Sequence, residues 1–150
     1  HRAIDVFAET HPAFCASRSR ISPARRRYAG VLVDIFYDHL LARDWARYHA
    51  DELGGYCARV YRQIAERRHH LPDSAHLALD LMATEDWLQS YGRLEGIADV
   101  LARMARRARK PNPLAGGEAD FVAAAEGFEG DFRAWLPDAQ RFVADWLATR

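Results

Sequence analysis

Apolar residues recur every three or four positions along most of the chain, which is the spacing of one face of an α-helix. The widest apolar stripe follows Ser22 and Pro23, a favourable N-cap and first-turn pair, and extends to about Arg43. No stretch alternates apolar and polar residues between hairpin turns, as exposed strands do. The pattern therefore predicts an all-α protein.

Breaks in this periodicity predict where the helices end. A first helix over 2–9 should end near Thr10-His11-Pro12, because the residue before a proline disfavours helical geometry. We expect further helices over 22–43, 49–68, 73–83, 94–107 and 117–149, a short segment at 87–91, and a break or kink at Pro137. Without internal repeats or a linker, residues 1–150 should form a single-domain bundle of about six or seven helices.

The composition, 49% hydrophobic and 28% charged, is typical of a folded globular chain. No run reaches transmembrane length and no signal peptide is visible, so we expect no membrane partner and a cytoplasmic location. Cys15 and Cys57 lack metal-ligand spacing, which favours free thiols over a single disulfide. Because the chain starts at His1, inside a predicted helix, we expect that it lacks its natural N-terminal segment.

Acidic and histidine residues stand at helical spacing in two places. The residues concerned are His1, Asp5, Asp34, Asp38 and His39. Residues four apart share a helix face, so two helices can present carboxylates and imidazoles to one point. These groups are ligands for divalent ions such as Mn²⁺, Zn²⁺ or Fe²⁺. Two alternatives stay open: a solvent-facing helix edge, or a salt network with Arg2 and Arg43.

The basic residues are nearly all arginine and occur in clusters. The first cluster comprises Arg18, Arg20, Arg25, Arg26 and Arg27. Clustered arginines favour recognition of phosphate or carboxylate groups, with solvated helix faces as the alternative interpretation. The formal net charge is zero, and aromatic residues do not interleave with basic ones as they do in single-strand nucleic-acid binders. We therefore expect no nucleic-acid partner.

Several of these residues form a pattern that resembles the acyl carrier protein phosphodiesterases. The pattern consists of His1-Arg2-Ala3-Ile4-Asp5, then Asp34-Ile-Phe-Tyr-Asp38-His39-Leu-Leu-Ala-Arg43-Asp-Trp45, then Leu71-Pro72, Glu85-x-Trp87-Leu88-x-x-Tyr91 and Ala105-Arg106-Arg107. The resemblance covers most of the chain and weakens after residue 113. Members of that family carry a further segment before the His-Arg-x-Ile-Asp motif.

The resemblance implies an all-α fold, divergent from the His-Asp metal phosphohydrolases, and dependence on Mn²⁺ or another divalent ion such as Mg²⁺. It implies hydrolysis of the phosphodiester that links 4′-phosphopantetheine to the serine of holo-acyl carrier protein. Carried onto this chain, it makes His1, Asp5, Asp38 and His39 the metal ligands. Asp34, Asp38 and His39 become the catalytic candidates.

Acyl carrier proteins are small and acidic, so the resemblance gives the arginines a use in docking. The expected docking residues are Arg18, Arg20, Arg25, Arg26, Arg27, Arg43 and Arg47. Two other functions stay open. One is a His-Asp type phosphohydrolase of nucleotides or small phosphoesters, and the other is a non-enzymatic helical module that binds an acidic protein. The sequence makes no prediction of the oligomeric state.

Overall fold

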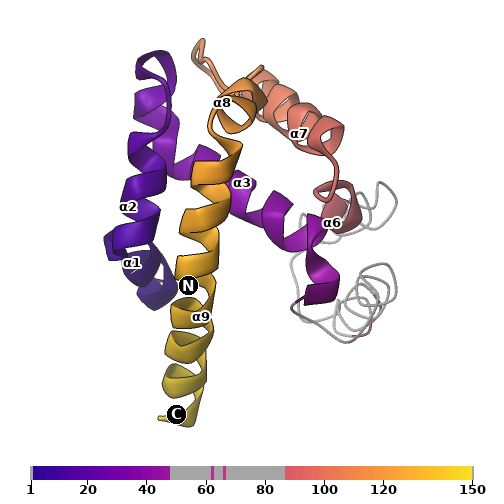
Figure 1. Ribbon diagram of the computed structural model, residues 1–150. Helices are drawn as coiled ribbons and strands as arrows, with labels where there is room; N and C mark the ends of the chain where they lie inside the picture. The colour runs from indigo at the N-terminus through magenta and orange to yellow at the C-terminus, as the bar shows by residue number, and fades with distance from the viewer. Residues whose placement is uncertain (1, 48–61, 63–65, 67–86, 150) are drawn as a thin grey trace. The chain divides into compact units, whose positions relative to one another are not determined.

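The computed structural model describes residues 2–47, 62, 66 and 87–149, and every regular element in these ranges is helical (Figure 1). The α-helices are α1 (Arg2–Thr10), α2 (Pro12–Ser19), α3 (Ala29–Arg43), α6 (Trp87–Ser90), α7 (Leu94–Arg107), α8 (Glu118–Ala123) and α9 (Ala125–Ala148), and the 3₁₀-helices are η1 (Pro23–Tyr28) and η2 (Trp45–Arg47). The all-α prediction is confirmed. The predicted helices over 49–68 and 73–83 lie outside the described residues, apart from two helical positions, Arg62 and Glu66.

The chain forms two compact units, which we describe separately. The first unit contains His1–Tyr37 and Ala98–Arg150, and the second contains Asp38–Ile97. The core of the first unit lies between α3, α8 and α9. There the Phe36 ring packs against Phe121 and Phe128, with ring centroids 5.4 and 5.2 Å away.

Helix α2 lies where the sequence analysis predicts no helix. The chain does end α1 near His11-Pro12, but it starts a new helix there at once. His11 has extended backbone geometry, and its Nδ1 accepts a hydrogen bond from the Ala13 N–H at 3.1 Å. Pro12 occupies the first turn, where its missing N–H is not needed. Histidine is an unusual N-cap, which is why the start of α2 is hard to predict.

The predicted helix over 22–43 is confirmed as η1 followed by α3, and its start has Ser22 at the N-cap and Pro23 in the first turn, as predicted. Ser22 makes no side-chain cap. Its N–H and hydroxyl instead donate to the Asp120 carboxylate, at 3.2 and 2.9 Å. This acceptor comes from α8, far along the chain, so the Ser22 side chain contacts α8 and makes no hydrogen bond to its own helix.

The C-terminal helix also differs from the prediction at its interruption. The chain breaks at Ala124, with φ −136° and ψ 32°, and α9 then runs through Pro137 without ending. Pro137 is exposed. Solvent can therefore hydrate the backbone carbonyl that loses its N–H partner. Of the predicted break or kink at Pro137, the break was wrong, and the kink stays a prediction.

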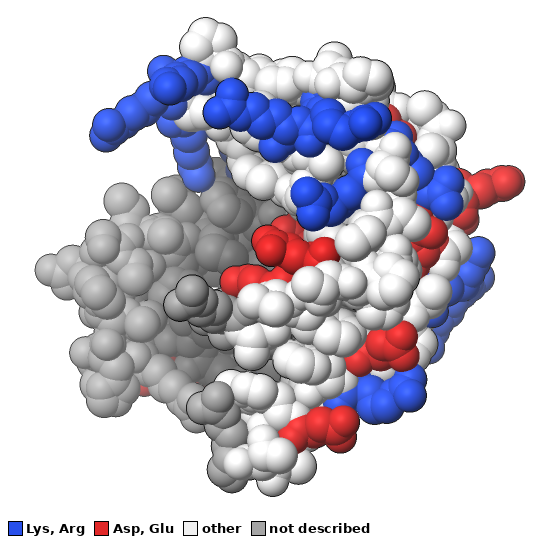
Figure 2. Space-filling view, turned by 90° about the vertical axis from the view of Figure 1, so that its left-hand side faces the viewer, with Lys and Arg blue, Asp and Glu red and all other residues white. Residues whose placement is uncertain are grey.

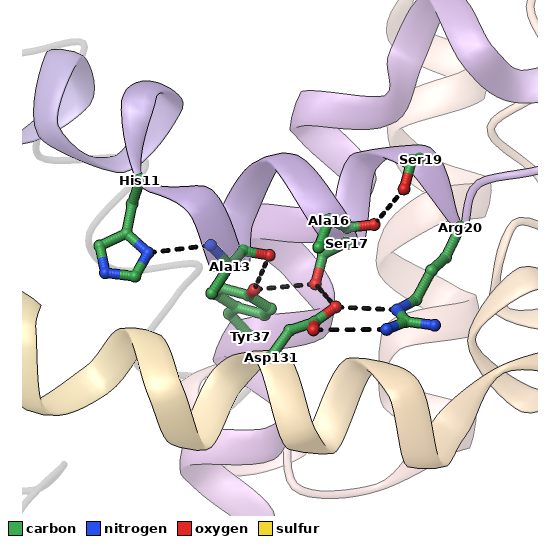
Figure 3. Close-up of polar contacts among 8 residues, drawn as sticks. All are labelled: His11, Ala13, Ala16, Ser17, Ser19, Arg20, Tyr37 and Asp131. Carbon is green, nitrogen blue, oxygen red and sulfur yellow. Dashed lines mark hydrogen bonds and ion pairs between the residues drawn. The ribbon is translucent and has the colours of Figure 1, made fainter.

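Helix α2 is fixed to α3 and α9 by a buried polar network (Figure 3). Ser17, which is fully buried, donates to the Asp131 carboxylate at 2.8 Å, and its oxygen lies 2.8 Å from the Tyr37 hydroxyl. Arg20 Nε also donates to Asp131 at 2.8 Å. Because Ser17 has one proton and a carboxylate only accepts, the Tyr37 hydroxyl donates to Ser17. The network sets the position of Arg18 on α2 relative to Asp34 on α3.

Candidate functional site

A pocket of about 450 Å³ opens in the first unit between α1, α2, η1 and α3. Its charged lining residues are Asp5, Glu9, Asp34, Arg18 and Arg27. The structure thus brings together two of the predicted site acids, Asp5 and Asp34. Glu9 is a third acid that the sequence analysis missed, although it follows Asp5 by the same four-residue helical spacing.

One acid of the pocket, Asp34, has a strongly shifted pKa. Asp34 is exposed at the surface of α3, yet it lines the pocket, where surrounding protein limits the hydration of its carboxylate. This burial, followed by the negative charges of Asp5 and Glu9, raises the pKa of Asp34 to about 6. A carboxylate with such a pKa is a candidate proton acceptor near neutral pH.

The same pocket carries two arginines, Arg18 from α2 and Arg27 from η1. The face of the molecule with α1 and α2 shows acidic side chains gathered near a band of basic ones (Figure 2). No ion pair between these arginines and Asp5, Glu9 or Asp34 occurs in the described part of the chain. The pocket therefore carries acidic and basic side chains that are not paired with one another.

The other predicted docking arginines mostly have contacts within the chain. Their contacts are Arg20 with Asp131 at 2.8 Å, Arg25 with the Pro113 carbonyl at 2.8 Å and Asp120 at 3.5 Å, Arg26 with the Ile21 carbonyl at 3.1 Å, and Arg43 with Asp44 at 2.9 Å. Arg47 is exposed at the end of η2. Docking by these residues stays a prediction.

The second unit holds the predicted Asp38 and His39. His39 is buried, and its Nδ1 lies 2.7 Å from the Tyr91 carbonyl oxygen. A carbonyl only accepts, so Nδ1 carries a proton and donates it to this oxygen. Metal-ligating histidines commonly have this arrangement. Asp38 is exposed on α3.

The predicted ligand set of His1, Asp5, Asp38 and His39 stays a prediction. His1 lies outside the described residues. Within the described ranges, no three or more His, Cys, Asp or Glu side chains form a group that could hold a metal ion. Asp34 and Asp38 occupy exposed positions of α3. Their exposure agrees with the alternative interpretation, in which these acids form the solvent-facing edge of a helix.

The sequence matches the protein family described as acyl carrier protein phosphodiesterase over residues 1–139. The chain belongs to this family. Acyl carrier protein phosphodiesterases similar to it include those of Photorhabdus laumondii and Serratia proteamaculans, each 30% identical, and of Yersinia enterocolitica, 34% identical. The matches cover 91%, 97% and 91% of this chain, and 70%, 76% and 72% of the respective relatives. No solved structure matches significantly.

The family assignment confirms the resemblance found in the sequence. The relation to the His-Asp phosphohydrolases stays a prediction. Among the described residues, no helix is both long enough and apolar enough to span a membrane.

Proposed function

We propose that this chain is a cytoplasmic hydrolase that cleaves the phosphodiester between 4′-phosphopantetheine and the serine of holo-acyl carrier protein. The observation that carries the proposal is the family match over residues 1–139. The pocket supports it, because carboxylates and arginines side by side suit phosphoester chemistry. The products are apo-carrier protein and 4′-phosphopantetheine.

The cofactor of this proposal is a divalent ion, Mn²⁺ or Mg²⁺, for which carboxylate oxygens are suitable ligands. Its proposed ligands, His1, Asp5, Asp38 and His39, rest on the family resemblance, because the described side chains alone form no group that could hold a metal ion. When bound, it supplies Lewis-acid polarisation of the phosphoryl oxygen and lowers the pKa of a water ligand.

Asp34 acts as the proton acceptor in this proposal. With a pKa of about 6, it is ionised at neutral pH and basic enough to take a proton from the attacking water. The water oxygen bonds to phosphorus, and the bond between phosphorus and the serine oxygen breaks. The serine oxygen leaves with the electron pair of that bond and becomes a hydroxyl on gaining a proton.

The proposal is tested with variants of the whole chain. Asp34→Asn, Asp38→Ala and His39→Gln are each expected to lower the release of 4′-phosphopantetheine by about a hundredfold or more, the usual contribution of a proton-transfer or ligand group. Asp145→Ala, at an exposed site of α9, is the matched control and should keep full activity. The release of 4′-phosphopantetheine is measured from the conversion of holo- to apo-carrier protein.

Melting temperatures show whether each variant is folded, which matters most for the buried His39. Near-normal release by a folded Asp38→Ala or His39→Gln protein contradicts the assignment of these residues. The alternative function, a general phosphohydrolase, predicts that the chain hydrolyses a simple phosphodiester as fast as it hydrolyses holo-carrier protein.

A further inference from the structure

Two arginines of the pocket differ from the other arginines nearby. Within the described part of the chain, Arg18 and Arg27 make no hydrogen bond or ion pair, whereas Arg20, Arg25 and Arg26 all do. Both unpaired side chains line the same pocket, although they come from different elements, α2 and η1.

The arrangement is unusual because oppositely charged groups share the pocket without pairing. Ion pairs with Asp5, Glu9 or Asp34 would satisfy the guanidinium groups, but the described structure contains none. Guanidinium groups left without a partner beside a pocket are ready to bind an anion through forked N–H donors.

The size of the pocket favours a small ligand group over a protein surface. Its volume of about 450 Å³ lies in the range of small-molecule sites. Docking of a carrier protein would instead use a broad surface, of roughly 800 Å² on each partner. The lining also includes Val31 and Tyr28, which can contact the uncharged part of a ligand.

We propose that Arg18 and Arg27 form the phosphate subsite of this pocket. They hold the phosphate group of the 4′-phosphopantetheine linkage through their guanidinium groups. The inference rests on the proposed function for the identity of the ligand. It separates these two arginines from Arg20 and Arg25, whose partners Asp131 and Asp120 give them structural contacts.

The test compares the binding of 4′-phosphopantetheine with that of pantetheine, which lacks the phosphate, by titration calorimetry on the whole chain. The unmodified protein should bind the phosphorylated compound at least about tenfold more tightly. Arg18→Gln and Arg27→Gln should each weaken binding of 4′-phosphopantetheine by about tenfold and leave pantetheine binding unchanged. Arg18→Lys and Arg27→Lys should fall between, since lysine keeps the charge but loses the fork.

Arg133→Gln is the matched control, because Arg133 is an exposed arginine of α9 outside the pocket lining. It should change neither affinity. Three results overturn the subsite: no preference for the phosphorylated compound, unchanged affinity in both pocket Gln variants, or an equal loss in the Arg133→Gln control.

The same data separate this inference from the proposed function. If the phosphate preference depends on Arg18 and Arg27 but holo-carrier protein is not hydrolysed, the subsite stands and the proposed function fails. If hydrolysis occurs but the preference is independent of both arginines, the function stands and the subsite fails.

Discussion

Asp34 is the residue at which fold and chemistry conflict. It lies between the buried residues Val33 and Ile35, on a helix most of whose other positions pack into the core. Burial and the nearby Asp5 and Glu9 raise its pKa to about 6, so its ionised form is destabilised in the folded state. Groups arranged this way occur at functional sites more often than in purely structural positions.

Asp34→Asn should therefore stabilise the protein at neutral pH while it lowers activity by about a hundredfold or more. The pKa of Asp34 rises from 3.8 to about 6 on folding, so the ionised carboxylate destabilises the fold above pH 6. This penalty fades as the pH falls and is gone below the unfolded pKa. Since Asp34 is exposed, solvent screening limits the gain to about 1 kcal/mol.

Chemical denaturation at pH 7.5, 6 and 4 measures this effect. The difference in the free energy of unfolding between the variant and the unmodified chain should shrink steadily toward pH 4. Asp145→Asn, the matched exposed control, should show no such trend. A stability difference for Asp34→Asn that is constant with pH would show that Asp34 does not titrate as described.

At this scale the sequence predicts which acids recur at helical spacing, and it locates Asp5 and Asp34. It does not predict Glu9, because one acid on an exposed helix is indistinguishable from ordinary surface charge. Nor does the sequence predict that Arg20 and Arg25 form ion pairs within the chain. Their partners, Asp131 and Asp120, follow them by 111 and 95 residues, and only the folded chain brings them together.

At the scale of elements, the placement of α2 on α3 depends on the Ser17–Tyr37–Asp131 network. Tyr37→Phe removes the hydroxyl that donates to Ser17, and burial already raises the pKa of that hydroxyl to about 12. The loss should cost about 1 kcal/mol and lower the melting temperature by about 2–4 °C.

Tyr28→Phe is the matched control, because the described structure gives the Tyr28 hydroxyl no hydrogen bond. Its melting temperature should stay close to that of the unmodified protein. Calorimetry of the two variants checks the prediction. Equal melting temperatures would mean that the network adds no net stability.

Periodicity predicts the long helices, since α3, α7 and α9 each bury one or more faces. It does not predict α2, whose N-cap is a histidine, or the break at Ala124, where no glycine or proline stands. It also overestimates the tendency of Pro137 to end the helix, because proline ends a helix less reliably where the carbonyl that loses its N–H partner faces solvent.

At the scale of the whole molecule, the net charge is zero, but on the face in Figure 2 a band of basic side chains lies near a group of acidic ones. If arginines steer an acidic carrier protein, KM for holo-carrier should rise about tenfold between 50 and 300 mM NaCl while kcat changes little. Steady-state kinetics over this series measures both constants. A flat KM, or a fall in kcat alone, would count against electrostatic docking.

The fold class and the family are predictable from sequence because both depend on patterns spread along most of the chain. The ligand set is harder, because ligands from different helices meet only through tertiary packing. His1 and the segment between α3 and α6 lie largely outside the described residues. The binding of a metal ion therefore stays a prediction, whereas the pocket between α1, α2, η1 and α3 is observed in the structure.

The central claim is that the chain removes 4′-phosphopantetheine from holo-acyl carrier protein. The most direct test is the intact mass of purified holo-carrier after incubation with the chain and Mn²⁺ or Mg²⁺. The account predicts conversion to the apo mass with release of free 4′-phosphopantetheine, and conversion about a hundredfold slower or more with Asp34→Asn. A carrier that keeps its holo mass with the folded, unmodified chain and either ion would contradict it.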